Sequence, residues 1–153
     1  MILNFAHEQY KTMRRYARYC KRYLTKVGLG EKTPMYVDLI SRIEWARASL
    51  YFFLKINPDT KMCKKFSKEF LDLFSEGVDL FQEVSQNFYQ FSMEKTTALL
   101  KKQKILIEKT RLLTKRNIAD DAIAAQRLEP ILHSTLYLTN VTISINLQGI
   151  KMN

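Results

Sequence analysis

The chain has 153 residues, of which 46% are hydrophobic and 26% charged, a balance typical of one globular domain and not of a disordered segment. Four glycines and three prolines supply little material for the many turns of an all-β sandwich, which argues against that class. Lysine and arginine outnumber aspartate and glutamate by 25 to 15, which gives a formal net charge of +10. Such a charge points to an anionic partner and says nothing about the fold.

The location of the protein is predicted from what the sequence lacks. No run of about 18 uncharged apolar residues occurs, so no membrane-spanning helix is predicted. The apolar run at residues 1–5 is too short for a secretory signal, and we expect a cytoplasmic location. Cys20 and Cys63 share no spacing typical of a metal or redox site. Each falls on the apolar side of an expected helix, so we expect buried, reduced thiols.

The first two helices have clear sequence boundaries. Apolar residues recur at steps of three and four over residues 4–27, and Gly28 then provides a stop. The second expected helix has Thr33 as its cap and begins at Pro34, a favourable residue for the first helical position. It runs to about Asn57, which precedes a proline and is therefore pushed away from helical angles.

The third expected helix starts near Asp59 or Thr60 and ends between residues 85 and 92. Its apolar positions keep helical phase for more than six turns. Gly77 lies on this apolar side although glycine is unfavourable inside a helix, which suggests that another helix approaches closely there. The fourth expected helix covers about residues 93–115. No strong breaker separates it from the third, so one long helix is an open alternative.

The C-terminal part of the sequence is ambiguous. Residues 117–121 interrupt the helical pattern, and a short fifth helix at 122–128 is expected to end or kink at Pro130. Between residues 140 and 148, polar residues alternate with valine, isoleucine and leucine, which is typical of a half-buried strand. The apolar residues of the same stretch also fit one face of a helix. Both readings stay open.

These patterns predict an all-α fold. We expect an antiparallel four-helix bundle domain over residues 1–135, with room for a short fifth helix. An irregular or strand-like C-terminal tail, residues 136–153, would be available for contacts with a partner or a second copy. The expected core joins the phenylalanines of the third helix to six residues of its neighbours, namely Trp45, Leu50, Phe53, Leu99, Leu106 and Leu113.

Two of the expected helices carry the whole excess of positive charge. Residues 1–30 contain seven basic residues and one acidic residue, and residues 95–117 contain eight and one. Cations at steps of three and four line one side of the first helix, with Tyr16, Tyr19 and Tyr23 between them. The expected phosphate-binding cations are Lys11, Arg14, Arg15, Arg18, Lys21, Arg22, Lys101, Lys104, Arg111 and Lys115. A second row on the fourth helix recurs every seven residues, at Lys102, Lys109 and Arg116.

This charge pattern favours a nucleic acid, RNA or DNA, as the partner. Phosphates relieve the repulsion within each row, arginine forks suit phosphate oxygens, and tyrosine rings can stack on unpaired bases. The leading hypothesis is a non-catalytic nucleic-acid-binding accessory or architectural protein whose two basic helices act as one platform. Two other readings stay open: the rows are ordinary solvated faces with the tyrosines packed in the core, or residues 4–27 lie on a membrane surface.

A row of carboxylates on the third helix suggests an alternative function. Its five members step by three and four, so they can face the basic helices of the same molecule or those of a neighbour. In the second case the protein would be a protein-binding scaffold or a homo-oligomer subunit, in a ring or a higher assembly. An ordinary solvent-facing side is the simpler reading. The row consists of Glu69, Asp72, Glu76, Asp79 and Glu83.

Motifs for catalysis are scarce. His7 belongs to no zinc motif, no phosphate-binding glycine loop occurs, and we expect no cofactor, no metal and no catalytic residue. Arg127 and His133 are separated by five residues, which resembles the arginine–histidine pair of helical ribonucleases of the HEPN class and implies ribonuclease activity as a minor alternative. Leu128 and Pro130 depart from that pattern, in which a polar residue follows the arginine in an unbroken helix. We therefore expect that the protein is not an enzyme.

Overall fold

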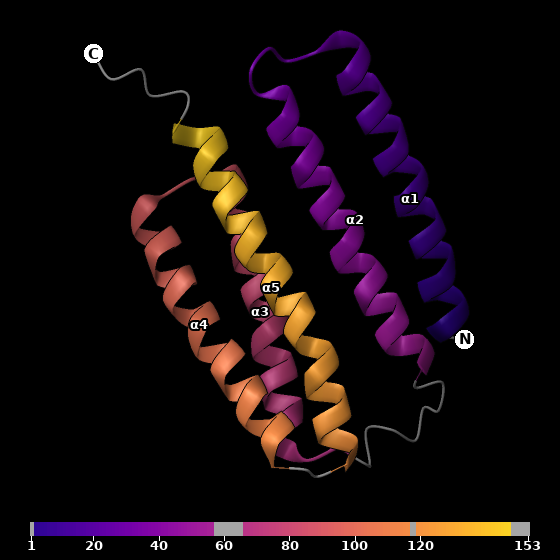
Figure 1. Cartoon of the computed structure of the whole chain (residues 1–153), viewed down its shortest axis with the longest axis vertical. Helices are drawn as coiled ribbons and strands as arrows, with labels where there is room; N and C mark the ends of the chain where they lie inside the picture. Colours follow the sequence, from indigo (N-terminus) through magenta and orange to yellow (C-terminus); the bar gives the residue numbers. More distant parts are fainter. Residues whose placement is uncertain (1, 57–65, 117–118, 148–153) are drawn as a thin grey trace.

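A computed structural model describes residues 2–56, 66–116 and 119–147 of the chain. They form five helices, α1 (Ile2–Val27), α2 (Thr33–Ile56), α3 (Lys68–Tyr89), α4 (Met93–Lys115) and α5 (Ala119–Leu147), as Figure 1 shows. No strand occurs in these ranges beyond a single local bridge between Leu29 and Glu31. The all-α fold that the sequence predicts is confirmed.

The helices are arranged as a three-helix unit with a helical hairpin on one side. α3, α4 and α5 all contact one another, α2 packs against α5, and α1 packs against α2. The Arg42 guanidinium of α2 lies 4.1 Å from the centre of the Tyr137 ring of α5, which helps to hold the hairpin on the unit. The antiparallel four-helix bundle is not confirmed, because five helices pack here and α1 contacts α2 alone among the described helices.

Side-chain caps and two glycines explain where the helices begin and end. Gly28 and Gly30 have φ values of +69° and +60°, the left-handed region that ends α1. The Thr33 hydroxyl, at the start of α2, accepts a hydrogen bond from the Leu29 N–H at 2.6 Å. A serine caps α3 and another caps α4, and each accepts a hydrogen bond from the N–H three residues further on. The predicted stop at Gly28 is confirmed. Thr33 is itself the first residue of α2 and its hydroxyl binds the Leu29 N–H behind it, so its expected role as the cap before Pro34 is wrong.

The start of α3 differs from the prediction. Ser67 is the N-terminal cap and Lys68 the first helical residue. The Ser67 N–H also donates to the Asp121 carboxylate at 3.1 Å, which ties the beginning of α3 to that of α5. Asp59 and Thr60, the expected starts, lie outside the described residues.

α5 is longer and more regular than the sequence predicts. The helix continues through Pro130, and the described part of the strand-like stretch, residues 140–147, is helical. The hydroxyls of Thr139 and Thr142 are buried, and each donates to the carbonyl four residues earlier, at 2.9 and 2.8 Å. Polar side chains satisfied in this way can face the core, so the strand-like reading of residues 140–147 is wrong. The expected domain boundary at residue 135 falls inside α5, and residues 148–153 lie outside the described ranges.

The hydrophobic core lies mainly where α3, α4 and α5 meet. The predicted leucines of α4 (Leu99, Leu106 and Leu113) are all buried there. Phe53 of α2 is buried as well, but Trp45 and Leu50 are 48% and 37% exposed, so their expected place in the core is wrong. α2 packs against α1 and α5, and its Phe53 ring also stacks near the Phe74 ring of α3, with centroids 5.9 Å apart. The side of α2 that carries Trp45 and Leu50 faces solvent. None of the described helices combines the length and apolar character needed to cross a lipid bilayer.

Candidate nucleic-acid interface

The two basic helices lie on opposite sides of the molecule. In Figure 1, α1 is at one edge and α4 at the other, with α2, α3 and α5 between them, and α1 and α4 make no contact. They cannot act as one platform, so the expectation of a shared surface is wrong. The reason is the position of α2, which separates α1 from the three-helix unit. Each basic helix is therefore considered separately.

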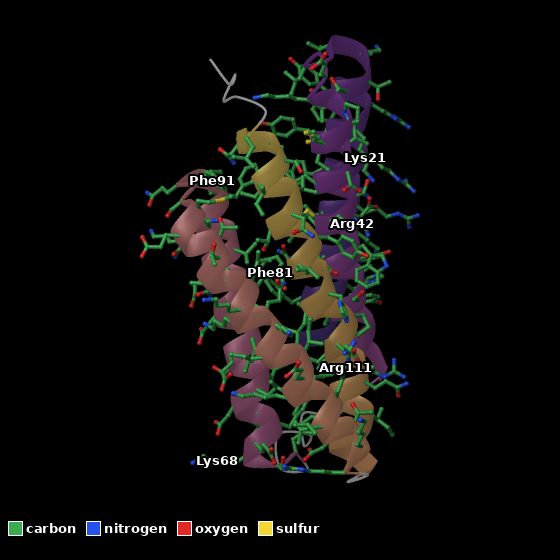
Figure 2. The ribbon with its side chains drawn as sticks, turned by 60° about the vertical axis from the view of Figure 1, so that its left-hand side comes forward. Lys21, Arg42, Lys68, Phe81, Phe91 and Arg111 are labelled. Carbon is green, nitrogen blue, oxygen red and sulfur yellow. The ribbon has the colours of Figure 1, made fainter. Side chains whose placement is uncertain are left out.

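The inner side of α1 is fixed to α2. Ala17 is buried at this contact, and the Tyr10 ring stacks on Tyr51 with centroids 4.9 Å apart. Lys21 donates to the Glu44 carboxylate at 2.8 Å, and both side chains are more than two-thirds buried. Figure 2 shows Lys21 on the side of the α1–α2 hairpin. Lys21 was expected to bind phosphate, but it already has a carboxylate partner within the chain.

The outer side of α1 carries arginines that have no carboxylate partner. Arg14, Arg15, Arg18 and Arg22 are exposed, and none forms an ion pair with any described residue. Lys11, at the start of the same row, is bound only by the exposed Glu8 one turn earlier, at 3.2 Å. Like charges at such spacings repel one another. The four arginines therefore form a concentrated positive surface without a carboxylate partner among the described residues.

Three tyrosines lie beside these arginines in solvent. Tyr16, Tyr19 and Tyr23 are 65%, 68% and 54% exposed. They step by three and four along α1, so they form a row next to the arginines. The reading that placed these rings in the core is wrong. Together with Lys11, Arg14, Arg15, Arg18 and Arg22, the three tyrosines make up what we call the outer face of α1.

Two further residues of α1 were missed or misplaced by the sequence analysis. Lys26 is exposed in the last turn and extends the outer face by one turn. Its spacing of four from Arg22 is visible in the sequence and could have identified it. Cys20 is exposed, not buried as expected, because α1 packs against α2 alone and buries only a narrow strip. Cys63 lies outside the described residues.

One row of cations on α4 is neutralised by α3. α3 carries a glutamate every seven residues, at Glu69, Glu76 and Glu83. Each pairs with one of the cations that recur every seven residues along α4 and its C-terminal cap. The pairs are Lys102–Glu83 at 2.7 Å, Lys109–Glu76 at 2.9 Å and Arg116–Glu69 at 2.7 Å. We call these three pairs the charge ladder. Because both helices run antiparallel in one heptad register, the pairs form along their whole shared length.

The other expected phosphate-binding cations of α4 differ among themselves. Arg111 donates from Nε to the Glu129 carboxylate of α5 at 2.8 Å. This hydrogen bond lowers the pKa of Glu129 below its ordinary value, and the charge of Arg111 adds to the shift. Lys101, Lys104 and Lys115 are exposed and form no ion pair within the described ranges. Three of the four expected α4 cations thus remain accessible, without tyrosines beside them.

The acidic row of α3 is partly used within the chain. Glu69, Glu76 and Glu83 belong to the charge ladder. Asp72 and Asp79 are exposed and form no ion pair with a described residue. Three of the five carboxylates therefore face α4 of their own molecule, while Asp72 and Asp79 remain exposed to solvent.

Arg127 and His133 lie on one continuous helix. Six residues correspond to about 600° of helical rotation, so the two side chains leave α5 about 120° apart. His133 lies 3.5 Å from the Glu129 carboxylate, whereas the buried Arg127 Nε has no hydrogen-bond partner among the described residues. The two side chains do not converge on one point.

Comparisons with known proteins add no assignment. No protein-family model matches the chain, and neither the curated proteins nor the solved structures contain a significant match. The described residues contain no group of three or more His, Cys, Asp or Glu side chains that could hold a metal ion. A functional proposal therefore depends on the surface chemistry of the chain itself.

Proposed function

We propose that the protein is a non-catalytic nucleic-acid-binding accessory or architectural protein that contacts phosphates through the outer face of α1. One observation carries this proposal: the arginines of that face are exposed and have no carboxylate partner within the described chain. On α4, by contrast, the heptad row and Arg111 are already paired. The proposal therefore assigns the principal contact to α1 and only a secondary one to the unpaired lysines of α4.

The physical basis is the relief of repulsion within the arginine row. Arg14, Arg15, Arg18 and Arg22 are neighbours on the helix surface, so each raises the electrostatic free energy of the others. A polyphosphate chain neutralises all four and releases its condensed counterions. Arginine also binds phosphate oxygens through two parallel N–H groups. The scaffold alternative has less support, because three of the five carboxylates on α3 have partners in their own chain.

The test compares two charge-reversal variants with the same change in net charge. In the first, Arg15, Arg18 and Arg22 of α1 become Glu. In the matched control, three unpaired lysines of α4 become Glu, namely Lys101, Lys104 and Lys115. Binding of fluorescently labelled oligonucleotides is measured by anisotropy at several salt concentrations. Far-UV circular dichroism and thermal melting confirm that both variants fold.

The expected result is a selective loss of binding in the α1 variant. Four phosphate contacts give a slope of log K against log salt of about −3 for a single strand, which the α1 variant should lose. The α4 variant should retain most of the affinity and most of that slope. Equal losses in the two variants would show that overall charge, and not the outer face of α1, governs binding. Unchanged binding by the α1 variant would contradict the proposal.

A further inference from the structure

We infer that the outer face of α1 is built for single-stranded nucleic acid, with arginines on the phosphates and tyrosines stacked on unpaired bases. This inference depends on the proposed function and specifies its substrate class. The observation behind it is the exposure of Tyr16, Tyr19 and Tyr23, for which phosphate binding alone gives no reason. An aromatic ring in solvent next to a cationic row is the combination found in proteins that bind single strands.

The tyrosine rings have an orientation suited to consecutive bases. Tyr19 and Tyr23 are nearly parallel, with an angle of 19° between their planes and 6.4 Å between their centroids. Bases stacked on the two rings would therefore lie nearly parallel to each other, as neighbours in a stacked strand do. Tyr16 continues the row by one step of three residues towards the N-terminus.

The cations and the rings alternate closely enough for one strand to contact both. Tyr19 lies one turn after Arg15 and one turn before Arg22, so it is a surface neighbour of each. From Lys11 to Lys26 the face is about 22 Å long, from the rise of about 1.5 Å per residue. It lies at the edge of the molecule, away from the three-helix unit, as Figure 1 shows. No other described helix covers it.

Other partners fit the face less well. A duplex keeps its bases paired inside, so it would leave the tyrosine rings without stacking partners. A membrane-surface helix needs a broad apolar face, whereas the exposed rings here carry hydroxyl groups beside arginines. An acidic protein surface could use tyrosine and arginine, since both are common in binding hot spots, but it gives no reason for two rings to be held parallel.

The test uses three probes with the same number of phosphates per strand. These are oligo(dT) of about 12 nucleotides, the same oligonucleotide with abasic sites in place of its bases, and a duplex whose strands have that length. Two variants are compared with wild type: Tyr16, Tyr19 and Tyr23 all changed to Ala, or all changed to Phe. Both substitutions are on the surface of a helix, and alanine is the best helix former, so the fold should persist. Circular dichroism verifies this.

Wild type should bind oligo(dT) more tightly than the abasic strand or the duplex. Loss of one base stack corresponds to about a 5- to 150-fold loss of affinity. We therefore expect the Ala variant to bind oligo(dT) at least about tenfold more weakly than wild type does. The Ala variant should also bind oligo(dT) no more tightly than it binds the abasic strand. The Phe variant keeps the rings and should bind within about threefold of wild type. Duplex binding should be the same in all three proteins.

The outcomes separate this inference from the proposed function. If wild type binds the duplex or the abasic strand as tightly as oligo(dT), the single-strand inference is wrong while phosphate binding by α1 stands. If the Ala variant binds oligo(dT) like wild type, the tyrosines do not stack on bases and the inference is again wrong. The last outcome concerns the triple variant in which Arg15, Arg18 and Arg22 are changed to Glu. If wild type binds none of the probes with higher affinity than this variant does, both proposals fail, and an acidic protein surface becomes the partner to test.

Discussion

Reversal of the central pair of the charge ladder should destabilise the protein by a small, predictable amount. Lys109 Nζ lies 3.1 and 2.9 Å from the two carboxylate oxygens of Glu76, and both side chains are nearly half exposed. An exposed pair of this kind contributes about 0.2–1 kcal/mol. Glu76→Lys removes that attraction and adds a repulsion of similar size, so we expect a loss of about 0.5–1.5 kcal/mol. Lys109→Glu should cost a similar amount.

The neighbouring pairs should have little influence on this result. They lie one heptad away, about 10.5 Å along the helix, which exceeds the Debye length of about 8 Å at physiological ionic strength. The exchange variant Glu76→Lys/Lys109→Glu restores opposite charges and should recover most of the stability lost in the single variants. Lys101→Glu on the same helix is the matched control. Since Lys101 has no carboxylate partner among the described residues, its reversal should leave stability within about 0.5 kcal/mol.

Urea unfolding followed by circular dichroism measures all four variants, and the double-mutant cycle isolates the pair. Because the exchange variant should recover most of both single losses, the coupling free energy should be about 1–3 kcal/mol at physiological salt. It should shrink at about 1 M salt, where the Debye length is about 3 Å. A coupling of zero at physiological salt, with a loss of stability in the exchange variant equal to the sum of the losses in the single variants, would refute the ladder. The proposed assignment of nucleic-acid binding to α1 also requires the exchange variant to bind oligonucleotides like wild type.

Two further predictions concern α5 and its neighbours. Because hydrogen bonding and charge from Arg111 lower the pKa of Glu129, the ionised carboxylate stabilises the fold above its ordinary pKa of 4.5, and this contribution is lost as the pH falls through the lower folded value. Acid unfolding of Arg111→Gln should therefore depend less steeply on pH below about 4.5, and an unchanged profile would contradict the pairing. A β-carbon at Gly77 would lie 3.4 Å from a Leu132 methyl group, an ordinary contact. Gly77→Ala should therefore raise the free energy of unfolding by up to about 1 kcal/mol and the melting temperature by about 2–4 °C. A lower melting temperature would mean that the contact between α3 and α5 tolerates no added methyl group.

The helices with strong local signals could be predicted from the sequence. Thr33 and Pro34 mark the start of α2, Gly28 follows the end of α1, and the fourth helix has the predicted bounds of residues 93–115. At Gly28 and Pro34 a local signal lies next to an apolar period of 3.6, so local and long-range preferences agree. The break between the third and fourth helices has no such strong signal in the sequence, and the structure shows two helices with Ser92 as the cap of α4. The close approach expected at Gly77 is also observed, since side chains of α5 lie within 4.0 Å of its ideal β-carbon.

α5 could not be predicted with the same rules. Threonines at alternate positions suggest the solvent side of a strand, but in α5 Thr139 and Thr142 satisfy their hydroxyls within the helix and become buried. Local preference also penalises Pro130, yet Leu128 and Leu132 on either side of it are buried in the core. The gain from burying those leucines opposes the cost of about 3 kcal/mol for a proline inside a helix. Tertiary packing decides such cases.

The candidate site was only partly visible in the sequence. The periodicity of Arg15, Arg18 and Arg22 identifies a basic row, but periodicity cannot say which carboxylates lie opposite it. The pairing of Glu76 with Lys109 depends on the antiparallel register of α3 and α4, and the separation of α1 from α4 depends on the position of α2. The basic rows of α1 and α4 look similar in the sequence, but the heptad row of α4 is paired with carboxylates of α3 and the arginine row of α1 has no carboxylate partner among the described residues.

The most direct measurement is the affinity of oligo(dT) for the two charge-reversal variants across a salt series from about 50 to 200 mM. Reversal of Arg15, Arg18 and Arg22 should abolish both the binding and its salt dependence, while reversal of Lys101, Lys104 and Lys115 should leave most of each. Retention of binding by the α1 variant, in a protein whose circular dichroism and melting are unchanged, would contradict the account.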